Sequence, residues 1–259
     1  PGPAIPVWQF WSGQYMDIPD HLPKGNRLVV AVDGPAGAGK GAVCRAAAAR
    51  CRLAYLETGA LYRAMGLLAE REQLTTPPAL ARRAADMPFA YRATGDGQFR
   101  AWLADEDVTM LLRSETIGQS ASRIAALPAV RTALLAFQRR YAPGQHLILD
   151  GRDVGTVVWP DADLKIFLTA SLEERAQRRV RELQGTEKYV NFAEVYAAMG
   201  ERDQRDAGRA DAPLKPAADA ILVDTTRLTL AESIDQVVQL IKNTLKKTDF
   251  ACSESGIGA

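Results

Sequence analysis

The sequence predicts an α/β protein in which helices cover a doubly wound parallel sheet of five strands. Five short apolar runs have the length of buried strands, and segments long enough for helices separate them. The first run ends in the glycine-rich stretch "DGPAGAGKGA" at 33–42, which opens a segment of strong helix formers. Strands that alternate with helices are joined by right-handed crossovers, which gives this fold class.

Taken in order, the predicted strands are "RLVVAVDG" (27–34), "LAYLETG" (53–59), "HLILDG" (146–151), "LKIFLTA" (164–170) and "AILVDTT" (220–226). Two regions break the alternation. Between 87 and 108, two short alternating runs flank Asp96-Gly97, which predicts a hairpin. Residues 171–210 predict two charged helices joined near Gly185; no broad apolar face is evident, so we expect them to lie above the core and to move.

The two ends differ from the domain expected at 28–245. Residues 1–27 are rich in Pro and Gly but carry Trp8, Phe10, Trp11 and Tyr15, which indicates an irregular extension lying on the domain or an arm that binds a partner. Residues 246–259 have the composition of a flexible tail. No apolar run approaches the roughly 18 residues that span a bilayer, and a signal peptide is not evident, so we expect a cytoplasmic protein without membrane contact.

Composition narrows the function classes. The 259 residues are 47% apolar and carry a formal net charge of +1, which argues against a general nucleic-acid binder. Arginine outnumbers lysine 24 to 8, which reflects either phosphate recognition or a coding bias. The three cysteines, Cys44, Cys51 and Cys252, form no metal or disulfide pattern, and we expect the first two on the buried face of a helix.

A phosphate-binding loop is predicted between the first strand and the first helix. Gly34, Gly39 and Lys40 fit G-x-x-x-x-G-K, and the alternative is an ordinary glycine-rich turn. Converging backbone N–H groups and the helix N-terminus would hold the phosphates, and the lysine would reach the β- and γ-phosphates. The predicted nucleotide-binding residues are Gly34, Pro35, Ala36, Gly37, Ala38, Gly39, Lys40, Gly41 and Ala42.

An aspartate and a set of arginines complete the predicted site. Asp150 ends the strand "LILD" and is either a magnesium ligand or a turn former. Phosphoryl transfer chiefly requires positioned phosphates and neutralised charge, which arginine forks supply, although charged helices are also commonly only solvated. The arginines concerned are Arg63, Arg152, Arg175, Arg178, Arg179, Arg202, Arg205 and Arg209.

Five motifs in order resemble the bacterial cytidylate kinase family over roughly residues 28–240. They are "VAVDGPAGAGKG", "LETGALYR", "ASRIAALPAVR", "ILDGRDVGTVVWPDADLKIFL" and "ERDQRDAGRADAPLKPAADAILVDTT". The resemblance implies a P-loop kinase fold with a small β insert at about 86–111 and a helical lid at about 178–210. It also implies transfer of the γ-phosphate of Mg-ATP to CMP, and to dCMP, with Lys40, Asp150, Arg152 and Arg202 as catalytic residues and Asp150 as the metal ligand.

The same resemblance implies the acceptor site. It assigns the base to Thr58, Arg131, Asp153 and Arg209, the sugar to Ser122, Arg202 and Asp206, and the acceptor phosphate to Arg63 and Arg152. Gly41 belongs to the family pattern, but Ala42 departs from it, because the family usually has threonine there. Thr58 replaces the usual serine and keeps a hydroxyl.

Two alternatives to CMP phosphorylation stay open at this point. One is a related kinase with another acceptor, such as UMP, AMP or a small alcohol. The other is a nucleotide-binding module that Ala42 has weakened or inactivated. We expect small nucleotides as the partners and a monomer as the active form.

Overall fold

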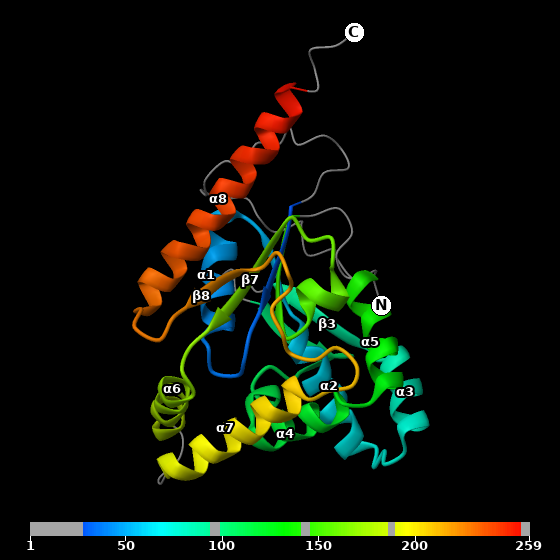
Figure 1. Ribbon diagram of the computed structural model, residues 1–259. Helices are drawn as coiled ribbons and strands as arrows, with labels where there is room; N and C mark the ends of the chain where they lie inside the picture. Colours follow the sequence, from blue (N-terminus) through cyan, green and yellow to red (C-terminus); the bar gives the residue numbers. More distant parts are fainter. Residues whose placement is uncertain (1–27, 94–98, 141–145, 186–189, 255–259) are drawn as a thin grey trace. The chain divides into compact units, whose positions relative to one another are not determined.

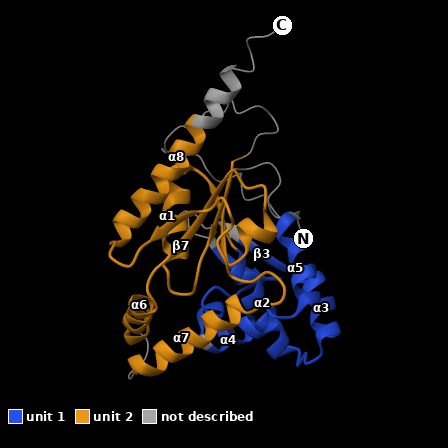
Figure 2. Cartoon of the chain, in the orientation of Figure 1, with its two compact units in different colours: residues 1–14, 58–141 blue, residues 15–57, 142–259 orange. Residues whose placement is uncertain are grey.

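The computed structural model describes residues 28–93, 99–140, 146–185 and 190–254. The chain divides into two compact units, coloured separately in Figure 2. Unit 1 holds residues 58–141 and unit 2 holds residues 15–57 and 142–259, as far as they are described. The predicted extension at 1–27 lies outside the described residues.

Unit 2 is built on a parallel sheet whose strand order is β2-β6-β1-β7-β8 (Figure 1). Among the described residues it has five strands: β1 Val29–Asp33, β2 Ala54–Glu57, β6 Leu147–Gly151, β7 Leu164–Thr169 and β8 Ile221–Asp224. Each strand lies within one of the five predicted runs, and every neighbouring pair is parallel. The predicted sheet is therefore confirmed, with β1 at its centre.

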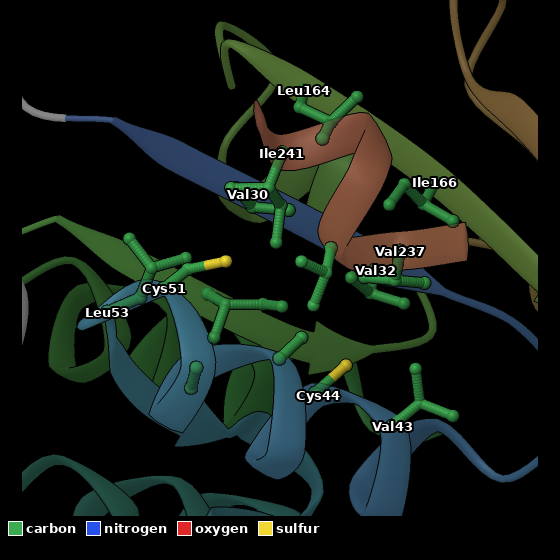
Figure 3. Packing of buried hydrophobic residues seen from close by; sticks show 14 of the residues in the cluster. Val30, Val32, Val43, Cys44, Cys51, Leu53, Leu164, Ile166, Val237 and Ile241 are labelled. Carbon is green, nitrogen blue, oxygen red and sulfur yellow. The ribbon is translucent and has the colours of Figure 1, made fainter. Parts of the chain in front are cut away.

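Helices α1 (Lys40–Cys51) and α8 (Leu230–Glu254) pack on each other and enclose the core of unit 2 against the sheet. Val30 and Val32 of β1 lie between these helices in Figure 3, with Cys44 of α1 and Ile241 of α8 nearby. Cys44 and Cys51 are buried free thiols, as predicted. This packing fixes the strand that precedes the glycine-rich loop and the helix that follows it.

The predicted flexible tail at 246–259 needs a correction, because α8 continues to Glu254. Glycine and proline, which would end a helix, are missing from the sequence between Leu230 and Glu254, and Leu245 packs against the core cluster. Composition alone indicated no regular structure at 246–254, where the structure has the last turns of α8. Residues 255–259 lie outside the described residues.

The predicted pair of charged helices is also present in unit 2, as α6 (Leu172–Gln184) and α7 (Phe192–Ala207). The side chains of Ser171 and Asn191 cap their first turns by accepting backbone hydrogen bonds. A single π-helical turn, η3 (Val154–Val158), follows β6. In the described part of the chain, no helix is long and apolar enough to cross a membrane.

Unit 1 combines helices with a small antiparallel sheet of order β3-β4-β5. Its described elements are α2 Thr58–Arg71, α3 Pro77–Ala85, β3 Phe89–Ala93, β4 Phe99–Leu103, β5 Glu106–Asp107, the 3-10 turn η2 Leu111–Arg113, α4 Glu115–Ile124 and α5 Pro128–Arg140. The antiparallel pairing of β3 with β4 confirms the predicted hairpin. Its Asp96-Gly97 connection lies outside the described residues, and β5 is a strand that the pattern did not predict.

Candidate active site

The glycine-rich loop joins β1 to α1 in backbone conformations that require glycine. Gly34, Gly37 and Gly39 have φ values of 149°, 74° and 89°. A Cβ atom added at Gly34 would stand 1.9 Å from the carbonyl oxygen of Leu168, so β7 leaves no room for a side chain there. The loop is therefore pressed against the sheet, and its amides lead directly into the N-terminus of α1.

Lys40, the first residue of α1, is buried, and its Nζ donates to the carbonyl oxygen of Pro35 within the loop at 2.8 Å. Burial lowers the pKa of Lys40, and the nearby Arg152 lowers it further, whereas Asp150 opposes the shift. The side chain thus lies along the loop where phosphate oxygens would be received.

Asp150 lies beside the start of α1. Its position on β6 is paired with Val32 of β1, and its Oδ2 atom would stand 3.6 Å from a Cβ added at Gly41. The hydroxyl of Tyr55 donates to Asp150 Oδ2 at 2.9 Å. Burial raises the pKa of Asp150, and Glu57 raises it further. The sequence reasoning missed Tyr55, whose only signal was its place in an otherwise apolar strand.

These residues fit a magnesium–nucleotide site. Magnesium prefers oxygen ligands and keeps several of its waters, so one carboxylate beside the phosphate loop is a sufficient protein contribution. Asp150 provides that carboxylate, while the exposed Ala42 provides no hydroxyl.

A connected group of charged side chains lies at the C-terminal end of β6; it consists of Arg152, Asp206 and Arg209. Arg152 Nε lies 3.1 Å from Asp206 Oδ2, and Arg209 pairs with Asp206 Oδ1. The Asp206 side chain is only 2% exposed. Arg202 lies one helical turn before Asp206 on α7, so both project from one face. By contrast, Arg205 lies 3.7 Å from Glu201 on its own helix, and half of its side chain is exposed.

Asp153 follows Arg152 directly and is buried. It stands at the N-cap position of η3 but makes no side-chain bond to that turn. Instead, Asp33 accepts hydrogen bonds from the amides of Val154 at 2.7 Å and Gly155 at 2.8 Å. Sequence reasoning quoted Asp33 in the loop motif but gave it no role.

The other predicted arginines separate into two groups. Arg175 donates to the carbonyl oxygens of Ala36 and Ala170 and pairs with Asp203 on α7 at 2.7 Å. Arg178 donates to Thr225 and has its Nη1 atom 3.9 Å from a Cβ added at Gly39. Both therefore lie at the phosphate loop, whereas Arg179 pairs with Glu182 on its own helix.

Four predicted acceptor residues belong to unit 1. Arg63 donates to the carbonyl oxygen of Leu112 at 2.7 Å and lies against Gly118. Arg131 lies over the ring of Tyr62, with its Cζ atom 5.7 Å from the centroid. Thr58 is buried at the start of α2.

The fourth is Ser122, on α4. Its Oγ atom is buried without a hydrogen-bond partner among the described residues. A buried hydroxyl without a partner is costly, and such groups often mark ligand sites.

Comparison with known proteins assigns the family. The family model for cytidylate kinase matches residues 30–243. A cytidylate kinase from Magnetococcus marinus is 54% identical over 221 residues, which cover 85% of this chain and 98% of that protein. A cytidylate kinase from Chromobacterium violaceum is 46% identical, covering 82% of this chain and 94% of that protein.

A bifunctional pantoate ligase/cytidylate kinase from a Synechococcus strain is 42% identical, covering 92% of this chain but 45% of that protein. The match to the family model covers the strand–loop–helix segment, the end of β6 and helices α6 and α7. On this evidence, the chain belongs to the cytidylate kinase family.

Proposed function

We propose that this chain transfers the γ-phosphoryl group of Mg-ATP to CMP, and also to dCMP, giving ADP and CDP or dCDP. Membership of the cytidylate kinase family supports the reaction class. The observation that carries the proposal is that one strand end, β6, bears Asp150 beside the phosphate loop and Arg152 and Asp153 immediately after it. The donor site and the acceptor site would then be adjacent, because the four residues 150–153 contribute to both.

The donor phosphates would be held by the loop at 34–42. Its backbone amides and the N-terminus of α1 favour anions, and Lys40 would exchange its bond to Pro35 for phosphate oxygens. Asp150 would hold magnesium directly or through water. When bound, magnesium neutralises charge on the β- and γ-phosphates.

The acceptor phosphate would be bound by Arg63 and Arg152. Arginine forks match phosphate oxygens in pairs, and in-line transfer depends mainly on such positioning and charge neutralisation. Arg152 is already held by Asp206, which limits the orientations of its guanidinium before substrate arrives. Arg202, one turn from Asp206, would add positive charge near the transferred group.

Asp153 would discriminate cytosine from uracil. Its carboxylate can accept a hydrogen bond from the 4-amino group of cytosine, whereas uracil presents an oxygen at that position. Two acceptors facing each other in a buried site cost a few kcal/mol. We assign Thr58, Arg131 and Arg209 to the remaining polar atoms of the base.

Ser122, Arg202 and Asp206 would contact the sugar. The Ser122 hydroxyl is buried and has no partner in the described chain, so a substrate hydroxyl would satisfy it. Accepting dCMP as well as CMP requires only that a contact to the 2′-hydroxyl, which dCMP lacks, be dispensable.

Helices α6 and α7 would close over the bound substrates. A kinase that holds ATP ready for transfer must exclude water from the γ-phosphate, or ATP is hydrolysed. We propose that the chain acts as a monomer, in the cytoplasm, where its free thiols stay reduced.

The proposal is tested by following ADP release from Mg-ATP in a coupled spectrophotometric assay. CMP, dCMP, UMP and AMP are compared with a control that has no acceptor, and Lys40→Met serves as the inactive variant. We expect turnover that favours CMP and dCMP and very little ADP without an acceptor. Equal turnover with UMP or AMP would contradict the assigned acceptor, and binding without turnover would contradict the assigned reaction.

A further inference from the structure

A carboxylate from the central strand holds the turn that carries Asp153. Asp33, the last residue of β1, is 4% exposed and accepts hydrogen bonds from the amides of Val154 and Gly155 at 2.7 and 2.8 Å. These amides open the π-helical turn η3, where the first N–H groups have no partner within the turn itself. π-helical turns are rare and occur frequently at functional sites.

The hydrogen bonds of the turn show that the Asp153 side chain does not cap η3, although Asp153 stands at the N-cap position. An aspartate at an N-cap ordinarily turns its side chain toward the amides of the following turn. In this turn, which the structure describes in full, Asp153 makes no such bond, and Asp33 occupies the first two amides. Its carboxylate can therefore point away from the turn while its backbone is held at φ −148° and ψ 22°.

We propose that Asp33 is a positioning residue for Asp153 and thereby sets the preference for cytosine over uracil. The inference rests on the proposed function, since it takes Asp153 as the residue that discriminates the base. It adds a specificity role for a residue that lies 120 positions earlier in the chain and outside the acceptor site assigned above.

A second contact restrains the same turn. A Cβ atom added at Gly155 would stand 3.2 Å from Lys165 Cδ and 3.4 Å from Asp33 Oδ2. Lys165 is itself held by Asp219, with Nζ 2.9 Å from Oδ2. Gly155 is thus enclosed by Asp33 on β1 and Lys165 on β7, so a methyl group there would shift the turn without removing a charge.

The charges around Asp33 set the conditions of the test. The pKa of Asp33 is raised to about 6, mainly by burial and also by Asp153, while the two amides and Lys40 oppose the shift. At pH 8 the side chain is a carboxylate that accepts from both amides. Measurements at pH 8 therefore compare the variants with a protein in which Asp33 is ionised.

The test compares Asp33→Asn and Gly155→Ala with Asp163→Asn as a matched control. Asp163 also accepts an amide of β1, that of Val29 at 2.7 Å, but at the opposite end of the strand. The readout is kcat/KM for CMP divided by kcat/KM for UMP, in which the fraction of correctly folded enzyme cancels. The KM for ATP is measured alongside.

We expect Asp33→Asn and Gly155→Ala each to narrow the CMP-over-UMP ratio by about tenfold, equivalent to about 1.4 kcal/mol. Asp163→Asn should leave the ratio unchanged, and Asp153→Ala should narrow it at least as much as Asp33→Asn. The KM for ATP should change by less than about twofold in Gly155→Ala, because the added methyl group faces Lys165 and Asp33 and leaves Lys40 and the loop glycines unchanged.

Two results would overturn the inference. The first is that both Asp33→Asn and Gly155→Ala keep the wild-type CMP-over-UMP ratio. The second is that Asp33→Asn loses affinity for ATP but keeps this ratio, because Asp33 would then act on the phosphate loop. If Asp33→Asn does not fold, Gly155→Ala decides alone. A wild-type protein without any CMP preference would instead remove the proposed function, and this inference with it.

Discussion

At the scale of single residues, Ala42 is the difference from the family pattern that most directly bears on kinase activity. The family usually places a threonine hydroxyl at this position, and here the exposed alanine supplies none. The remaining donor-site groups are in place: Lys40 lies along the loop, and Asp150 is held beside the start of α1 by the hydroxyl of Tyr55. One missing neutral hydrogen bond is worth on the order of 1 kcal/mol, so binding should be weakened rather than lost.

Ala42→Thr should therefore tighten the binding of Mg-ADP by about fivefold, equivalent to about 1 kcal/mol. Isothermal titration with and without magnesium measures this, and the gain should appear only with magnesium. Ala49→Thr, two turns further along α1, controls for the lower helix propensity of threonine. Equal changes in the two variants would show that the missing hydroxyl has no consequence.

At the scale of elements, Arg175 connects the phosphate loop with helices α6 and α7. It extends from α6, donates to Ala36 in the loop and pairs with Asp203 on α7. Met199 of α7 reaches the same loop, because a Cβ atom added at Gly37 would stand 2.7 Å from its Cε. The position of α7 and the shape of the loop are therefore linked through buried contacts.

Arg175→Lys should raise the KM for ATP by about five- to tenfold and cost about 1–3 kcal/mol of stability, because an ammonium cannot reproduce the guanidinium fork. Steady-state kinetics and urea unfolding measure the two effects. Arg179→Lys, in which the residue changed pairs with Glu182 on its own helix, should change neither value appreciably. An Arg175→Lys variant with an unchanged KM would show that this link does not shape the loop.

The start of β1 has its own pH dependence. The amide of Leu28 donates to Nδ1 of His146 at 2.9 Å, which requires the neutral imidazole. Burial lowers the pKa of His146 below its usual 6.5, although Asp163 opposes the shift. The folded protein thus binds this proton less readily than the unfolded chain, so the stabilisation is complete above about pH 6.5 and is lost as the pH falls through the lowered pKa.

Thermal unfolding should show this at pH 7.5 and pH 5. Wild type should lose more stability on acidification than His146→Gln, whose carbonyl oxygen can accept the same hydrogen bond without titrating; the difference should be at most about 1 kcal/mol. Identical losses in the two proteins would contradict this role for His146.

At the scale of the whole molecule, local patterns were sufficient for the sheet, the phosphate loop, the hairpin and the two charged helices. Each depends on apolar periodicity, turn residues or glycine spacing over a short segment. The last turns of α8 were not predicted because the charged and polar residues after Lys246 suggested a tail, although no glycine or proline interrupts the sequence before Glu254.

Contacts between distant segments could not be predicted in this way. Asp33 reaches the amides of Val154 and Gly155 only because β1 and β6 are neighbours in a particular register, with Asp33 opposite Gly151. Tyr55 reaches Asp150 through the pairing of β2 with β6. The arginines likewise looked equivalent in sequence, and only the fold separates Arg175, at the loop, from Arg179.

The central claim is that the phosphoryl group passes from ATP to CMP in a protein whose loop carries Ala42. It is tested most directly by incubating the protein with ATP labelled in the γ-phosphate, magnesium and CMP, and separating the products. The label should appear in CDP, in a one-to-one ratio with the ADP formed. Label recovered as inorganic phosphate, or left in ATP while both nucleotides bind, would contradict the account.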